Sequence, residues 1–122
     1  SVRYESSVWI ESQVLSGVRY RVCRMTLAGR IALARRVREI GRSVEFLEAS
    51  DTTEGRLEAA IARGEVDRAY LEWGLREIEG LEINGRQAGP IDVHEHAPIE
   101  FALEVIQSIR KECGLQEDER KN

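Results

Sequence analysis

The beginning of the chain alternates between apolar and polar residues. The run VRYRV at residues 18–22 has a period of two, which is typical of a β-strand with one buried face. Residues 8–15 alternate less regularly, and Ser16-Gly17 separates the two stretches with a glycine that can adopt positive φ. The pattern predicts an N-terminal β-hairpin. Because a two-stranded ribbon is marginal in water, this hairpin must pack on a helix or on another chain.

A period of three to four residues replaces the alternation after Thr26, whose hydroxyl can cap a helix. The new period predicts an amphipathic helix of about six turns over residues 27–49. One stripe of this helix is apolar and the opposite face is rich in arginine. The stripe comprises Leu27, Ile31, Ala34, Val37, Ile40, Val44 and Leu47, and the opposite face carries Arg30, Arg35, Arg36, Arg38 and Arg42.

Residues 54–79 are also periodic like a helix, but with two apolar stripes in the later part. Two stripes indicate burial on more than one side, and the pattern leaves open whether one helix or two form here. The tract from Trp73 to Gly85 is interpreted as a helix end, a helix stop at Gly80 and a tight turn at Asn84-Gly85. That turn predicts a second, small hairpin.

A last helix is predicted to begin at Pro98, because the missing N–H of proline costs nothing at the first helical position. Apolar residues recur at helical spacing over residues 99–113. Gly114 is expected to end this helix, with Leu115 folding back on it as a hydrophobic contact.

The order of elements and the composition together predict one α+β domain over residues 1–115, dominated by helices. Its parts are an N-terminal β-hairpin, three or four helices, and the small Asn-Gly hairpin before the last helix. The hydrophobic fraction of 42% is ordinary for a globular chain of 122 residues. Residues 116–122 contain no apolar side chain, so we expect a charged, disordered tail there.

Charge and cysteine content narrow the class of partner and the compartment. The net charge of -4 argues against attraction of the whole surface to nucleic acid or to an anionic membrane. No apolar run approaches the ~20 residues that span a bilayer, and a signal-peptide pattern is lacking. Cys23 and Cys113 have no CxxC spacing, which favours free thiols in a reducing compartment. We therefore expect a cytoplasmic protein.

The candidate catalytic chemistry is sparse. His94 and His96 flank Glu95, but a zinc site needs three or four protein ligands and the pair supplies two. The glutamates around Glu72 have the spacing of a solvent-facing helix side, and GxSxG, P-loop and GxGxxG motifs are missing. We expect no enzyme, no cofactor and no metal. A buried cluster of Glu72, His94 and His96 in a deep pocket would favour an enzyme instead.

Aromatic and basic residues point to partner binding. Trp9 lies on the less apolar side of a possible edge strand, where unpaired backbone favours pairing with another chain. Trp73 is either an interface residue or the main aromatic of the core. The arginines of the first helix can contact phosphate or an acidic partner, but no aromatic residues interleave with them to stack bases. The predicted partner-binding residues are Trp9, Tyr20, Arg35, Arg38, Arg42, Tyr70 and Trp73.

Three segments of the chain are similar in sequence pattern to a known class of proteins. They are the strand SGVRYRV with the arginine-rich helix after it, the tract from Glu72 to Gly85, and the last helix with its charged tail. In these tracts the chain resembles the tail assembly chaperones of long-tailed bacteriophages and their prophages. The resemblance implies a non-enzymatic, mostly helical protein that coats the hydrophobic tape-measure protein and helps to recruit tail-tube subunits in the bacterial cytoplasm. Several members are made in two lengths by ribosomal frameshifting.

The leading hypothesis is thus a phage-derived protein-binding factor, a tail assembly chaperone that shields a partner such as the tape-measure protein or a tail subunit. One alternative is a nucleic-acid-binding regulator that uses the Arg-rich helix 27–49. The pronounced N-terminal hairpin departs from the chaperone pattern and also fits a small virion structural protein. The unpaired hairpin further favours self-association into a homo-oligomer.

Overall fold

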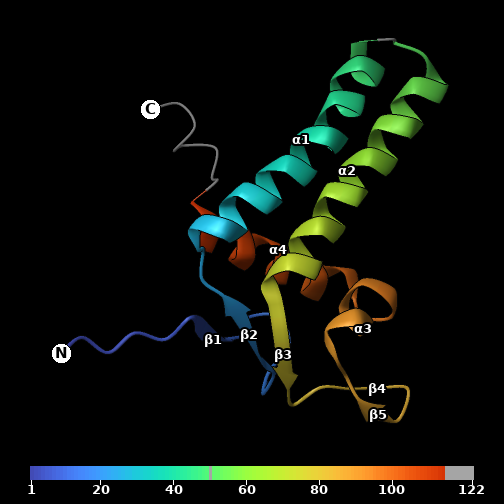
Figure 1. Cartoon of the computed structure of the whole chain (residues 1–122). Coiled ribbons are helices and arrows are strands. Elements are labelled where there is room, and N and C mark those ends of the chain that lie inside the picture. The colour runs from blue at the N-terminus through green and yellow to red at the C-terminus, as the bar shows by residue number, and fades with distance from the viewer. Residues whose placement is uncertain (50, 115–122) are drawn as a thin grey trace.

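The computed structural model describes residues 1–49 and 51–114, without the side chains of residues 43–49. The fold is α+β, with 56% helix and 18% strand, which confirms the predicted class (Figure 1). The elements follow in the order β1 (Ser7–Glu11), β2 (Arg19–Cys23), α1 (Leu27–Ala49), α2 (Thr53–Gly74), β3 (Leu75–Glu79), β4 (Glu82–Ile83), β5 (Arg86–Gln87), α3 (Pro90–Glu95) and α4 (Ile99–Cys113). The small Asn-Gly hairpin, β4–β5, therefore precedes both α3 and α4.

The first three strands form an antiparallel sheet in the order β1-β2-β3. The alternation in β2 sorts its residues as predicted, because Tyr20 and Val22 are fully buried while Arg19 and Arg21 lie on the other face. Gly17 supplies the positive φ of +80° in the turn before β2. The sheet thus has one apolar face and one charged face.

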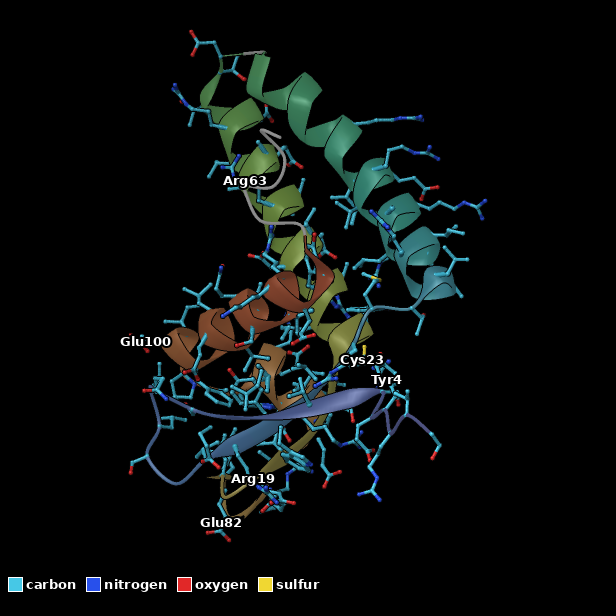
Figure 2. All side chains as sticks on the ribbon, turned by 90° about the vertical axis from the view of Figure 1, so that its left-hand side faces the viewer. Tyr4, Arg19, Cys23, Arg63, Glu82 and Glu100 are labelled. Carbon is cyan, nitrogen blue, oxygen red and sulfur yellow. The ribbon has the colours of Figure 1, made fainter. Side chains whose placement is uncertain are left out.

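The core lies between the apolar face of the sheet and α4, which crosses that face (Figure 2). Phe101 of α4 meets the ring of Tyr20 edge to face, with 5.7 Å between ring centroids and 86° between ring planes. The Tyr20 hydroxyl and the Ser108 hydroxyl are 2.8 Å apart and share a hydrogen bond. The end of α2 completes the core, so α2 and α4 together cover the apolar face of the sheet.

Helices α1 and α2 form a long antiparallel hairpin that projects from the sheet (Figure 1). The open question about residues 54–79 is answered in part, since Thr53–Gly74 is one helix despite the glycine at position 64. Near the base of the hairpin Gly29 allows a close approach. A Cβ there would lie 3.0 Å from Nε1 of Trp73, so the indole packs directly on the α1 backbone.

The apolar stripe predicted for α1 divides in two. Val37 and Ile40 are half-buried, whereas Leu27, Ile31 and Ala34 are exposed. The fully buried residue of this helix is Leu33, which the predicted stripe did not include. A hairpin of two helices has no further layer on its outer side, so part of an apolar stripe stays in solvent. The predicted positions Val44 and Leu47, the Leu115 contact and the tail 116–122 lie outside the described residues or side chains.

Residues 75–79, predicted as the end of a helix, form strand β3 instead. Pairing with β2 satisfies the backbone of this segment and buries Leu75 and Ile78. The helix propensity of its leucine, arginine and glutamates is worth only tenths of a kcal/mol per residue, so the tertiary contacts outweigh it. Gly80 is accordingly not a helix stop. It ends a strand with φ +83°.

The residues after Gly89 form the short helix α3, which the sequence pattern does not predict. Asp92 holds its first turn together, because the Gly89 N–H donates to Asp92 Oδ2 at 2.8 Å. The Asp92 carboxylate also lies 3.2 Å from Nδ1 of His96 and 3.5 Å from Nη2 of Arg86. Pro90 at the first helical position is pre-organised for the turn.

Replacing Asp92 with asparagine is expected to lower the melting temperature at neutral pH. The melting temperature of the variant should also fall less than that of the wild type when the solution is acidified. The N–H of Gly89 chiefly lowers the pKa of Asp92, and His96 and Arg86 lower it further against a smaller opposing effect of burial. A carboxyl whose pKa is lowered by folding stabilises the fold above its unfolded pKa of about 3.9, and this stabilisation disappears as pH falls through the folded value.

The check is the melting temperature by circular dichroism between about pH 7 and pH 2. The wild type should lose stability more steeply than Asp92→Asn below about pH 4. Glu58→Gln removes the same charge from an exposed position on α2 and serves as the control. Parallel curves for the wild type and Asp92→Asn would contradict the assignment.

Among the described residues, no helix is both long enough and apolar enough to cross a membrane.

Candidate protein-binding groove

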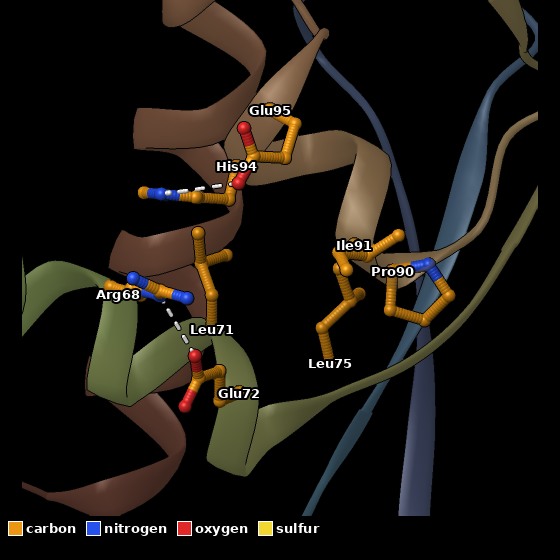
Figure 3. Close-up of a pocket in the computed structure, with 8 residues that line it drawn as sticks. All are labelled: Arg68, Leu71, Glu72, Leu75, Pro90, Ile91, His94 and Glu95. Carbon is orange, nitrogen blue, oxygen red and sulfur yellow. Dashed lines mark hydrogen bonds and ion pairs between the residues drawn. The ribbon is translucent and has the colours of Figure 1, made fainter.

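Two hollows lie side by side on the surface formed by α1, α2 and α3, and both are lined by Glu72. The hollow between α2 and α3 has a volume of about 260 Å³ (Figure 3). The hollow between α1 and α2 has a volume of about 350 Å³. We refer to the two together as the Glu72 groove.

The α2–α3 hollow has apolar walls and a charged rim. Leu71 comes from the last turn of α2, Leu75 is the first residue of β3, and Pro90 and Ile91 come from the start of α3 (Figure 3). Ile91 is 74% exposed, so it contributes little to the core. Arg68, Glu72, His94 and Glu95 form the rim.

The α1–α2 hollow is open because small side chains face it. Ala32 and Ala69 leave space between the helices, and Leu33 lies beside them. Trp73 forms an aromatic wall of this hollow and remains half-buried. Both hollows therefore offer apolar surface that is partly open to solvent.

Two arginines hold Glu72 at the junction of the hollows. Nη1 of Arg36 lies 2.8 Å from one carboxylate oxygen, and Nε of Arg68 lies 2.9 Å from the other. Arg36 is the main cause of the lowered pKa of Glu72, to which Arg68 adds while partial burial opposes both. Glu72 is thus ionised at neutral pH, and its pair with Arg36 ties α1 to α2.

The histidines do not join Glu72 in a buried cluster. His94 lines the same hollow, but its side chain is 40% exposed, and Nε2 lies 3.8 Å from Oε1 of Glu95 (Figure 3). His96 contacts Asp92 instead. The arrangement that would favour an enzyme is therefore not formed by these three residues. The described residues contain no group of three or more side chains that could hold a metal ion.

The two thiols are free and half-buried. Burial raises the pKa of Cys113 to about 11 and raises the pKa of Cys23 as well. Because the thiolate is the reactive species, neither cysteine is an activated nucleophile at neutral pH.

Trp9 lies on β1, which is an edge strand of the sheet. Its ring is half-buried on the charged face, with the guanidinium of Arg19 at 4.2 Å and that of Arg21 at 5.9 Å from the ring centroid. Arg19 is visible on this face in Figure 2, on the side of the sheet away from α4. Trp9 is thus partly accessible but does not line the Glu72 groove.

Tyr20 and Tyr70 do not fit the partner-binding role predicted for them. Tyr20 is fully buried in the core, and Tyr70 is 3% exposed beneath the guanidinium of Arg110, which lies 4.4 Å from its ring centroid. A partner reaches neither ring while the fold is intact. Alternation and helical spacing show which residues share a face, but not which face is covered.

Arg35, Arg38 and Arg42 are exposed on α1, away from the groove. The neighbouring Arg36 lines the groove instead, together with Ile91, and neither was predicted. Of the seven predicted residues only Trp73 lines the Glu72 groove. A weak signal for Ile91 was present, since it is an isolated apolar residue after Gly89-Pro90 in a polar stretch.

No protein-family model matches the chain, and no curated protein or solved structure matches it either. What supports a function is the Glu72 groove itself, with its apolar walls, aromatic side and charged rim.

Proposed function

We propose that the protein is a non-enzymatic protein-binding factor and that the Glu72 groove receives a helical segment of its partner. The observation that supports this most is the exposure of Ile91 beside Leu71 and Leu75. An apolar side chain that the core does not use contributes free energy when a partner covers it, at about 25 cal/mol per Å² of apolar surface.

The two neighbouring hollows can receive side chains from one amphipathic helix. A helix that binds in a groove inserts apolar side chains spaced three, four or seven residues apart. The hollow at Ile91 and the hollow at Trp73 can each take one such side chain. The charges of Arg68 and Glu95 lie beside the hollows, where polar residues on the flanks of that helix would meet them.

More specifically, we propose that the protein acts as a tail assembly chaperone, which the resemblance of its sequence to that class supports. Its partner would be the tape-measure protein, whose hydrophobic segments need a cover until the tail assembles. Further apolar residues are exposed along the helical hairpin and extend the surface available for shielding. They are Leu27, Ile31, Leu57 and Ile61.

The nucleic-acid alternative is supported by one observation, the exposure of Arg35, Arg38 and Arg42 on α1. Phosphate contacts from such a row would release counterions, so binding would weaken steeply as salt is raised. The overall charge of -4 opposes this mode of binding.

Replacing Ile91 with glutamate is expected to weaken partner binding by at least about tenfold, because a buried charge replaces an apolar anchor. The test is co-expression with the tape-measure protein of the gene cluster that encodes this chain, followed by co-purification and titration of the purified complex. Ile99→Glu is the matched control, since Ile99 is 64% exposed on α4 and does not line the groove.

Three outcomes would contradict the proposal. The wild-type protein does not bind the tape-measure protein at micromolar concentration, or Ile91→Glu binds as well as the wild type, or both variants lose binding equally. Recovery of nucleic acid that is released by salt would instead favour the nucleic-acid-binding alternative, with the arginines of α1 as the contact residues.

A further inference from the structure

Among the described strands, β1 has a neighbour on one side only, so its outer edge presents unpaired backbone groups. The Ser6 carbonyl accepts from the N–H of Arg24 and the N–H of Ser12 donates to the carbonyl of Val18, both at 2.9 Å. In an antiparallel ladder, alternate residues direct both backbone groups to the same neighbour. The even-numbered residues of β1 therefore bond to β2, and the odd-numbered ones present their N–H and C=O groups at the open edge.

The residues before β1 repeat its alternation of apolar and polar residues but do not themselves form a strand. They contact the end of β2, where the guanidinium of Arg24 lies 5.8 Å from the centroid of the Tyr4 ring. Val2 and Tyr4 have the same parity as Val8 and Ile10, which pack against the core, so an extension of β1 places all four on one face. Val2 is 94% exposed and Tyr4 is 64% exposed. In Figure 1 this segment leaves the sheet and extends away from the helices. Extending β1 over this segment would therefore add two exposed apolar side chains to the apolar face of the strand.

The charged face of the sheet carries one row of alternating charge that ends at the open edge. In this row Glu79 of β3, Arg19 of β2 and Glu11 of β1 lie side by side. Nε of Arg19 is 2.6 Å from Oε2 of Glu79. This row ends on the negative charge of Glu11. A strand added at the edge is therefore favoured if it places a positive charge opposite Glu11.

We propose that the segment Arg3–Glu11 pairs with the same segment of a second copy of this chain, antiparallel, about a two-fold axis at Ser7. Arg3 of each copy then lies opposite Glu11 of the other, and Tyr4 lies opposite Ile10. Odd-numbered residues face each other, so the free backbone groups of both edges form the ladder. The two sheets become one sheet of six strands.

Neighbouring registers are less favourable. An axis one residue nearer the C-terminus places Glu5 opposite Glu11 of the second copy, and like charges opposite each other are destabilising. An axis one residue nearer the N-terminus brings Arg3 to Trp9, whose ring already contacts two guanidinium groups. A register that pairs odd with even residues would put apolar and polar side chains on the same face.

Charge reversal at Arg3 tests the pairing by sedimentation velocity over a range up to about 100 µM. The wild type is expected to dimerise, and Arg3→Glu is expected to raise the dissociation constant by about tenfold or more, because two favourable pairs per dimer become repulsive. Arg3 lies outside the packed core, so this variant keeps the monomer fold. Arg30→Glu makes the same charge change on the exposed side of α1 and is expected to dimerise normally.

The register is tested with a cysteine at the two-fold axis. Residues directly opposite each other in a hydrogen-bonded pair have Cα atoms about 5.5 Å apart, within the span of a disulfide. Cys23 lies directly opposite Ser7 within one chain, so it is first replaced by serine to prevent an intramolecular disulfide. In this Cys23→Ser background, Ser7→Cys should cross-link two copies on mild oxidation, whereas the background protein and Ser16→Cys in the exposed turn should not. A monomeric wild type, equal effects of the two charge reversals, or no cross-link specific to position 7 would overturn the proposal.

Discussion

The free energy of unfolding is expected to fall by about 3–5 kcal/mol when Phe101 is replaced by alanine. Phe101 has no exposed surface and its ring closes the core against Tyr20. Removing it leaves a cavity that the sheet and α4 cannot fill, since both are held by other contacts. Domains of this size have a free energy of unfolding of only about 5–15 kcal/mol, so the variant loses a large part of its stability and should be close to unfolding.

Equilibrium unfolding in urea, followed by circular dichroism, gives the number directly. Ile99→Ala on the same helix is the control, because Ile99 is exposed and should change stability by less than about 0.5 kcal/mol. A loss of less than about 1 kcal/mol for Phe101→Ala would mean that the core between the sheet and α4 is not packed as described.

Gly80→Ala is expected to lower the free energy of unfolding by about 2–4 kcal/mol, the largest loss after that of Phe101→Ala among the variants proposed. Gly80 has φ +83°, which strains any residue with a Cβ. A Cβ at this position would also collide with the carbonyl oxygen of Gly17 in the β1–β2 turn. Because the obstacle is backbone, relief of the collision requires the end of β3 and the turn to move apart.

Gly17 provides a matched control for the two effects. Its φ of +80° is nearly the same, but a Cβ there would have no neighbour within 4 Å. Gly17→Ala should thus show the conformational strain alone, about 1 kcal/mol, and the difference between the two variants should measure the close approach. Equal losses in the unfolding free energy would show that the collision relaxes at no cost.

The elements with a long, regular pattern could be predicted from the sequence. The hairpin β1–β2 follows from the alternation in VRYRV and the glycine at position 17, and α1 and α4 follow from their helical periods. The strand β3 could not be predicted, because LREIE has no clear alternation and its residues favour helices. Its conformation is decided by pairing with β2, a neighbour more than fifty residues away in the chain.

The Glu72 groove could be predicted only at Trp73. Its walls come from three helices and the first residue of β3, and Ile91 approaches Leu75 only because α3 folds against the end of α2. The periodicity of a sequence does not predict such a contact between separate elements. The misassigned aromatic residues Tyr20 and Tyr70 have the same origin, because a tyrosine on the apolar face of a strand or helix is buried or exposed according to what packs on it.

The central position of β2 has a consequence for the order of folding. Its first neighbour, β1, is close in sequence and can pair early, but Val22 meets Leu75 only after the chain has run through both long helices. Closing so large a loop is entropically slow for a flexible chain. The antiparallel hairpin of α1 and α2 returns the chain to its starting point, and so shortens the loop to be closed. We therefore expect the sheet to be completed late in folding, after the helical hairpin has formed.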